Sequence, residues 1–324
     1  MIRSSTVMVQ TLTIAMLMAF ADSVTAQQTY PNKLIRIITP YAPGGTTTIV
    51  GHVIGQKLTE SWAKPVVVDN RPGGNGFIGG EALVKSPPDG HTVILITSTH
   101  IITPLLLPAP YDPIKDFAAV ATLVSTEQVL VLHPSVAANN LQEFIALAKL
   151  KPGQLNYASA GSGGVPHLLG EMFNILAGTR MTHVPYKGSA PAIADLLGGH
   201  VHMFISPPID AMPNIKAGKL KAIAMSGRTR LSALPEVPTF AEGGLPAFDG
   251  RIWFGLLAPA GTPKEIINKF SAEIARILVM PDLGEKLRGL EPLVSTSDQF
   301  GALMKADTTK FSNIIKTANI KIEG

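Results

Sequence analysis

Three segments of the chain combine glycines with hydroxyl side chains where a strand is expected to give way to a helix. They are residues 40–48 (PYAPGGTTT), 158–167 (ASAGSGGVPH) and 97–100 (TSTH). A helix N-terminus leaves up to four backbone N–H groups without an intrahelical partner, and its peptide dipoles sum to a partial positive charge. Glycine allows a ligand to approach the main chain closely. The pattern therefore predicts a pocket for an anion such as a carboxylate or a phosphate.

The residues expected to contact this anion are hydroxyl side chains and main-chain amides of the three segments. They are Tyr41, Ala42, Thr46, Thr47, Thr48, Ser98, Thr99, Ser159, Ala160, Gly161, Ser162 and Gly163. Tyr41 and Ala42 are expected to frame the entrance. A later turn adds Tyr186 and Lys187, although a lysine in such a turn is usually solvated. Each hydrogen bond to a charged group contributes roughly 1.5–3 kcal/mol, so about four or five donors approach the roughly 8 kcal/mol of micromolar affinity without an arginine.

The same residues also have a purely structural interpretation. Gly-Gly is common in turns, and Ser or Thr before a helix is commonly its N-cap. Several such loops in one chain favour ligand binding, because ligands of open α/β sheets lie beyond the carboxyl ends of the strands.

An enzyme is the main alternative. Residues 160–164 (AGSGG) have the form of a nucleophile elbow around Ser162. A hydrolase would need an acid and then a histidine on later loops, but Glu171 and Asp195 both fit helical faces. We therefore expect no catalytic residue.

Metals, cofactors and nucleic acids are not expected as partners. The chain has no cysteine, and His200 and His202, expected on one face of a strand, have no nearby carboxylate pair. It has neither a Walker loop nor a G-x-G-x-x-G fingerprint, so a nucleotide cofactor has no support. The net charge is +4, but the basic residues are dispersed and aromatic residues make up 6%. A nucleic-acid groove needs clustered charge and stacking rings.

The elements that must position these loops are read from hydrophobic periodicity. Strands are expected at residues 34–39, 65–68, 92–97, 128–132, 155–158, 201–205, 220–225 and 252–258. Helices with one apolar face are expected around residues 49–58, 141–150, 168–176 and 266–278, and from about residue 297. Thr262 to Glu265 have the form of a capping box with Pro263 at the first helical position. Asp210 is expected to cap a helix after Pro207 and Pro208.

The N-terminus is expected to be a secretory signal. Arg3 precedes an apolar stretch at residues 7–20, and small residues end the segment at Ala26. This stretch is shorter than the about 20 apolar residues that cross a bilayer. We expect cleavage after Ala26 and an exported, soluble product.

The alternation of strands and helices in a chain of 324 residues, of which 46% are hydrophobic, predicts two α/β lobes. Residues 111–116 and 234–250 are rich in proline and glycine and separate β-rich blocks. We expect a first lobe of residues 27–126 and 250–324, a second lobe of residues 127–249, and a cleft between them.

The chain resembles the Bug receptor family, the periplasmic solute receptors of tripartite tricarboxylate transporter systems. The resemblance covers nearly all of the chain after residue 26. It is carried by residues 30–36 (YPNKLIR), 43–45 (PGG), 69–73 (DNRPG), 88–92 (PDGHT), 111–117 (YDPIKDF), 156–159 (NYAS), 183–188 (HVPYKG) and 256–263 (LLAPAGTP).

The resemblance implies a type II-like, two-lobe periplasmic-binding-protein fold that closes on a carboxylate. In the family, loops matching residues 41–48 and 159–163 hold the carboxylate, partly through ordered water, and Ser98 and Thr99 border the cleft. Thr48 and His52 stand where the family often has Asp and Arg, and His202 stands where it has Asp. An ammonium group would need an acidic partner, so a di- or tricarboxylate or an aromatic acid is expected rather than an amino acid.

The implied function is capture of a small organic carboxylate by a monomer that delivers it to a membrane permease. Two alternatives stay open: a ligand-sensing partner of a membrane sensor kinase, and a secreted serine hydrolase that uses Ser162. Which carboxylate binds does not follow from the sequence.

Overall fold

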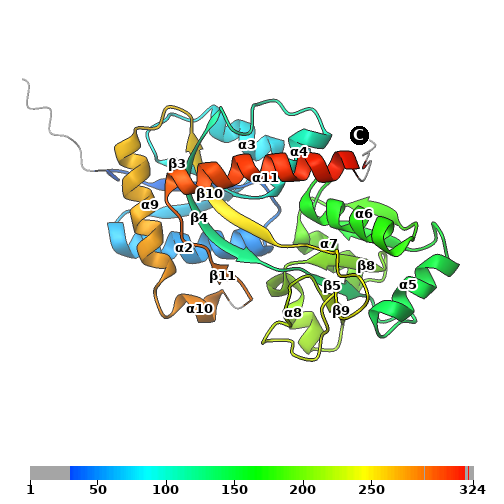
Figure 1. The fold of residues 1–324 in the computed structure, drawn as a ribbon. Coiled ribbons are helices and arrows are strands. Elements are labelled where there is room, and N and C mark those ends of the chain that lie inside the picture. Colours follow the sequence, from blue (N-terminus) through cyan, green and yellow to red (C-terminus); the bar gives the residue numbers. More distant parts are fainter. Residues whose placement is uncertain (1–29, 288, 318–319, 321–324) are drawn as a thin grey trace, which may run out of the picture. The chain divides into compact units, whose positions relative to one another are not determined.

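The computed structural model describes residues 30–287, 289–317 and 320 of the 324-residue chain. The expected signal segment, residues 1–26, lies outside the described residues. Lys33–Gly324 forms one compact unit, with two β-sheets that carry helices on their faces (Figure 1). None of the helices in the described ranges is long and apolar enough to span a membrane.

The first sheet, sheet A, has the strand order β11-β4-β10-β3-β1-β2. Its strands are β1 (Ile35–Thr39), β2 (Val66–Asn70), β3 (Thr92–Thr97), β4 (Phe117–Thr126), β10 (Ile252–Pro259) and β11 (Glu291–Pro292). β1 is parallel to β2 and β3, with Ile37 opposite Val68 and Val93. β10 is antiparallel to β3 and β4. Because β1 and β3 are parallel, the loops that follow them emerge at the same edge of the sheet.

The second sheet, sheet B, has the strand order β7-β6-β8-β5-β9. Its strands are β5 (Val129–Leu132), β6 (Asn156–Ser159), β7 (Thr182–Pro185), β8 (Met203–Ser206) and β9 (Lys221–Met225). β6 is parallel to β7 and β8, whereas β5 is antiparallel to β8 and β9. The loop after β6 therefore leaves the sheet beside the ends of β7 and β8.

The chain passes from one sheet to the other twice. It leaves sheet A at the end of β4 and enters β5 after two residues, and it returns between β9 and β10. Figure 1 shows β4 and β10 lying side by side as they approach sheet B. We call sheet A with its helices lobe A, and sheet B with its helices lobe B.

Helices cover the faces of sheet A. They are α2 (Thr46–Trp62), the 3-10 turn η2 (Gly74–Gly76), α3 (Phe77–Val84), α4 (Thr99–Leu106), α9 (Lys264–Leu278), α10 (Leu283–Lys286) and α11 (Ser297–Thr317). α2 packs against β1 and β2, and its buried Val50, Ile54 and Leu58 recur at every fourth residue. α9 and α11 pack against β4.

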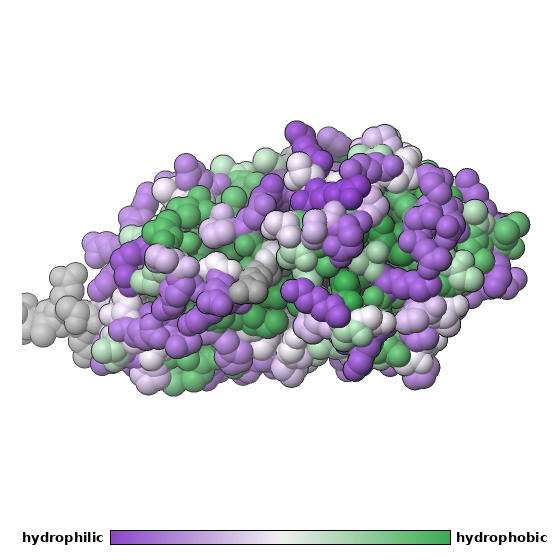
Figure 2. Space-filling view, turned by 90° about the horizontal axis from the view of Figure 1, so that it is seen from below, coloured by the Kyte–Doolittle hydropathy of each residue, from purple (hydrophilic) through white to green (hydrophobic). Residues whose placement is uncertain are grey.

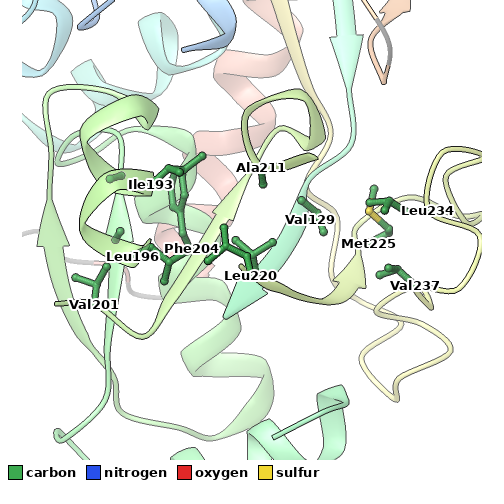
Figure 3. Close-up of a cluster of buried hydrophobic side chains, with 13 residues drawn as sticks. Val129, Ile193, Leu196, Val201, Phe204, Ala211, Leu220, Met225, Leu234 and Val237 are labelled. Carbon is green, nitrogen blue, oxygen red and sulfur yellow. The ribbon is translucent and has the colours of Figure 1, made fainter. Parts of the chain in front are cut away.

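Four helices belong to lobe B: α5 (Leu141–Leu150), α6 (Val165–Ala177), α7 (Ser189–Leu197) and α8 (Pro208–Lys216). α6 and α7 both pack against β6 and β8. Figure 3 shows the core beneath α7, where Ile193 and Leu196 lie over Phe204 of β8. The Phe204 side chain is fully buried.

Three local expectations from the sequence are wrong. The Thr262 hydroxyl donates to Pro259 O (2.8 Å) instead of capping α9, and Pro263 precedes the helix as its N-cap residue. Asp210 lies within the first turn of α8, where it does not cap the helix. His200 and His202 precede β8, which begins at Met203, so they do not share a strand face.

The sequence pattern also missed β4, β7, α3 and α7. The β4 sequence FAAVATLVST contains three alanines, which have low β-propensity. The α3 sequence FIGGEALV contains two helix-disfavouring glycines. These elements depend on packing and strand pairing that local propensity does not contain.

Candidate functional site

The first predicted loop places the N-terminus of α2 at the edge of sheet A. α2 begins at Thr46 after Gly45, which offers no side-chain cap. Thr46 and Thr47 both line a cavity between the lobes. In the part of the chain that the structure describes, neither the amide nor the hydroxyl of Thr47 has a hydrogen-bond partner. These two donors are therefore available to a molecule in the cavity.

Asn70, at the end of β2, holds this loop in place. Its Nδ2 donates to Thr39 Oγ1 (2.6 Å), Tyr41 O (3.0 Å) and Thr48 Oγ1 (2.9 Å). The Tyr41 hydroxyl lies 3.2 Å from Thr97 Oγ1, and burial raises the pKa of Tyr41, so its ring enters the cavity uncharged. Thr48 thus supports the loop and does not line the cavity.

The second predicted loop follows β6 and leads into α6. Ala160, Gly161 and Ser162 line the cavity. Ser159 is fully buried, and its Oγ both donates to Gly161 O (3.1 Å) and accepts from Gly161 N (3.2 Å). Gly161 has a φ of +146°, which glycine adopts without strain. Among the described residues, neither the amide nor the hydroxyl of Ser162 has a hydrogen-bond partner.

Two histidines support this loop from behind. His183 Nε2 lies 2.6 Å from Ser159 Oγ, and Gly163 N donates to His167 Nδ1 (3.0 Å). The imidazole rings stack with centroids 3.5 Å apart. Burial lowers the pKa of His167 to about 4, and burial together with His167 lowers that of His183 to about 3. Both rings are therefore neutral at pH 7, and Ser159 and Gly163 position the loop from outside the cavity lining.

This arrangement does not assemble a hydrolase triad around Ser162. Within the described ranges, no histidine forms a hydrogen bond with Ser162. The serine that contacts a histidine is Ser159, which is fully buried and pairs with His183. The two candidate acids are bonded elsewhere: Glu171 accepts from the Tyr157 hydroxyl (2.5 Å), and Asp195 accepts from the Tyr186 hydroxyl (2.7 Å).

The third predicted segment is divided between two roles. Thr99, the first residue of α4, lines the cavity and accepts a hydrogen bond from Val165 N (3.2 Å) at the start of α6. Ser98 is buried beneath it, and its amide donates to Trp253 O (3.1 Å). Ser98 therefore fixes the segment and does not line the cavity.

The cavity is lined by residues of both lobes. Its lining contains no Asp, Glu, Lys, Arg or His: Tyr41, Gly45, Thr46, Thr47, Asn75, Thr97, Thr99, Ala160, Gly161, Ser162, Gly164, Val165, Pro166, Ser189, Pro207, Ile252 and Phe254. Hydroxyls and helix N-termini provide its polar groups, and aliphatic, proline and phenylalanine side chains provide its apolar lining.

A second cavity shares Tyr41, Asn75, Ala160, Gly161 and Ser162 with the first. It also contains the predicted residues Tyr186 and Lys187. Burial and the Asp195 carboxylate raise the pKa of Tyr186 to about 12, which keeps its hydroxyl a donor to Asp195. The structure thus places Tyr186 and Lys187 beside the main cavity.

Several hydrogen bonds join the lobes around the main cavity. Ala42 N donates to Lys187 O (2.8 Å), so Ala42 serves as an inter-lobe contact. The Thr103 hydroxyl donates to Gly163 O (3.2 Å). The Thr46 hydroxyl donates to Asp210 Oδ1 (2.7 Å), and burial raises the pKa of Asp210 to about 6. The sequence predicts Asp210 only as a helix cap and gives no sign of its contact with Thr46.

Sequence reasoning also missed part of the lining. Asn75 lies in both cavities with a φ of +55° in η2. The only local signal for it is the turn composition of residues 73–76 (GGNG). Ser189, Pro207, Ile252 and Phe254 reach the cavity from α7, the loop before α8, and β10. No local motif marks these four, because their proximity depends on how the two sheets face each other. No cluster of metal-ligating side chains is found among the described residues.

Two α/β lobes joined by two crossings, with an uncharged cavity between helix N-termini, define the class of bilobal solute-binding proteins. The periplasmic binding protein BugD superposes with a TM-score of 0.86 at 29% identity, covering 90% of this chain and 99% of BugD. A Rhodopseudomonas palustris protein solved with adipate gives a TM-score of 0.87 at 31% identity, covering 90% of this chain and 99% of that one.

Protein BugT of Bordetella pertussis is 34% identical over 303 residues, which cover 91% of this chain and 92% of BugT. The family model of the tripartite tricarboxylate transporter family receptor matches residues 50–320. The chain belongs to this family, which confirms the resemblance and the two-lobe α/β fold predicted from the sequence.

Proposed function

We propose that this protein is a periplasmic receptor that captures a small carboxylate between its lobes and delivers it to the membrane permease of a tripartite tricarboxylate transporter. The observation that carries the proposal is the cavity, which is lined both by Thr47 in the first turn of α2 and by Ser162 in the loop before α6, each with free donors. Family membership and the adipate-bound relative support the same ligand class.

Neutral donors suit a carboxylate better than a more highly charged anion. A lone carboxylate can be satisfied by a few amides and hydroxyls, whereas a phosphate dianion usually recruits arginine or lysine. The cavity lining has neither. Binding through dipoles also leaves the ligand easy to release, which a delivery protein requires.

The apolar part of the lining indicates a ligand with a hydrocarbon body. It includes Val165, Pro166, Pro207, Ile252 and Phe254. Burying hydrocarbon contributes roughly 25 cal/mol per Å². A dicarboxylate with a methylene chain, a tricarboxylate or an aromatic acid fits a cavity that has both polar and apolar lining. Amino acids stay the less favoured class of ligand.

The remaining expectations belong to the same proposal. The lobes would comprise residues 27–126 with 250–324, and residues 127–249, after removal of residues 1–26 as an export signal. Figure 2 shows polar side chains interrupting the apolar patches over one face, and a monomer is part of the proposal. A membrane sensor kinase as the partner is the alternative. Co-purification with the permease or with the kinase distinguishes the two.

The test is a thermal-shift and calorimetric screen with adipate, malate, citrate, benzoate and glutamate. A ligand at 100 times its Kd should stabilise the protein by about 2.7 kcal/mol and raise its melting temperature. Thr47→Val removes one free hydroxyl without changing the side-chain shape and should weaken binding by roughly tenfold or more. Thr309→Val, on the exposed face of α11, should leave binding unchanged.

No stabilisation by any acid would contradict the carboxylate assignment. Turnover of ester substrates that Ser162→Ala abolishes would instead support the hydrolase alternative.

A further inference from the structure

Asp210 brings a carboxyl group from lobe B to the helix start that is proposed to hold the ligand. It lies in the first turn of α8, and its Oδ1 accepts the Thr46 hydroxyl of α2 at 2.7 Å. Its Oδ2 is buried and makes no hydrogen bond of 3.5 Å or less among the described residues. One oxygen of this carboxyl group therefore lacks a direct partner while the lobes are in contact.

The groups around Asp210 provide no compensating charge. Burial raises its pKa to about 6, and the hydroxyl and amide of Thr46 and the nearby Ser189 hydroxyl only partly offset this effect. The first turns of α2 and α7 contain no Lys, Arg or His. A buried carboxylate without a cation is disfavoured against its neutral, protonated form.

Charged and titratable side chains on the elements around Asp210 lie farther along those elements. α2 carries His52, almost two turns beyond Thr46, and α8 carries Lys216 in its last turn. α7 carries Asp195, which is already bonded to Tyr186 and lies 3.5 Å from His200 Nδ1. Lys187 lies in the loop before α7 and contributes its carbonyl to Ala42. None of them acts on the Asp210 carboxyl group.

Asp210 also lies immediately behind the cavity wall. Its partner Thr46 and its neighbours Ser189 and Pro207 all line the cavity. An anion held at Thr47 and Ser162 would therefore be close to a second negative charge if Asp210 were ionised. Two carboxylates that share a site raise the proton affinity of one of them.

We propose that Asp210 is a positioning residue that takes up a proton when a carboxylate binds and the lobes close on it, so that the receptor captures its ligand together with one proton. This inference rests on the proposed function, because it requires an anionic ligand. Protonated Asp210 keeps its Oδ1 contact with Thr46 and loses the charge that would repel the ligand.

The proposal predicts a pH dependence with a definite sign. A carboxylate ligand is ionised above pH 6, because its pKa is near 4. Asp210 is largely ionised above pH 6 without ligand and becomes protonated with ligand. Affinity should therefore rise as pH falls from 8 to 6, by roughly fivefold per pH unit. A ligand bearing an ammonium group at Asp210 would have the opposite effect.

Isothermal titration calorimetry with adipate at pH 7, in phosphate and in Tris buffer, measures the protons exchanged on binding. Wild type should take up nearly one proton per adipate bound. Asp210→Asn mimics the neutral carboxyl group, so it should take up none, and its affinity should be independent of pH from 6 to 8. Glu236→Gln removes an exposed charge elsewhere and should behave as wild type. If adipate does not bind, the acid giving the largest thermal shift replaces it.

Binding by wild type without proton uptake, or with proton release, would overturn this inference and leave the proposed function standing. Equal uptake by wild type and Asp210→Asn would also overturn it. If the variant does not fold, the wild-type measurement in the two buffers decides alone. Failure of every acid to bind would remove the proposed function and this inference together.

Discussion

Three consecutive threonines of α2 have different roles although they are chemically identical. The Thr46 hydroxyl donates to Asp210, and the Thr48 hydroxyl accepts from Asn70. The Thr47 hydroxyl has no partner in the described ranges and lines the cavity. A helix turns about 100° per residue, so neighbouring side chains face different surroundings. The residue types predicted a polar loop. Only the surroundings of each threonine decide whether its side chain lines the cavity or supports the loop.

Asp210 should also affect stability in a pH-dependent way. Its pKa is about 6 in the folded protein against an ordinary value of 3.8, so the folded state binds the proton more tightly than the unfolded state. The favourable contribution of the protonated group is fully present below pH 4 and is lost as pH rises through 6. As pH rises from 4 to 7, the free energy of unfolding of Asp210→Asn should therefore increase relative to that of wild type by up to roughly 3 kcal/mol.

Urea unfolding of both proteins at half-unit pH steps measures this difference. Glu236→Gln provides the control, and its difference from wild type should be nearly constant over the same range. Parallel pH curves for Asp210→Asn and wild type would show that Asp210 titrates normally in the folded protein.

At the scale of elements, the approach of α6 to β6 positions the second loop. Tyr157 of β6 is buried, and its ring lies against Gly170 of α6 so closely that a Cβ there would be 2.1 Å from the ring. Glycine is required by this contact and not by backbone conformation, since Gly170 lies inside a regular helix. This contact thereby fixes the first two turns of α6, which directly follow the loop that contains Ala160, Gly161 and Ser162.

Gly170→Ala should destabilise the protein by roughly 1–3 kcal/mol through overpacking, although alanine favours helix by about 1 kcal/mol. Ligand affinity should fall with it, because α6 must move away from Tyr157. Gly284→Ala is the matched control, since a Cβ in α10 meets no atom within 4 Å. It should be neutral or stabilising. Chemical denaturation and calorimetry report both effects, and equal outcomes for the two variants would contradict this account.

At the scale of the whole molecule, we expect binding to require the lobes to separate and close. Contacts between Ala42 and Lys187, Thr46 and Asp210, and Thr99 and Val165 surround the cavity. These contacts are hydrogen bonds, which can exchange with water when the lobes separate. Hinge closure around a ligand is the usual motion of bilobal binding proteins.

A disulfide across the cleft should prevent this motion. A Cβ at Gly45 would lie 3.6 Å from Ser189 Cβ, within the range of about 3.5–4.5 Å found in disulfides. The chain has no cysteine of its own. Gly45→Cys with Ser189→Cys should therefore form one bond, which should slow ligand entry and release at least about tenfold.

Ligand exchange followed by stopped flow, before and after addition of a reductant, measures this effect. Each single cysteine variant controls for the substitution itself. Equal exchange rates for the oxidised and reduced double variant would show that the ligand exchanges without opening at this edge.

The sequence by itself determined the α/β class and most strands of the two sheets, and it predicted that the loops at residues 40–48 and 158–167 form an anion site. Those signals are local: alternating hydrophobic runs, and glycines and hydroxyls at helix starts. The tertiary structure alone decided that Thr48, Ser98, Ser159 and Gly163 support the site while Asn75, Ser189, Ile252 and Phe254 line it. It also placed Asp210 against Thr46, 164 residues apart in the chain. The physical reason is that burial and proximity between two lobes depend on how the sheets face each other, and that arrangement is absent from any local window of sequence.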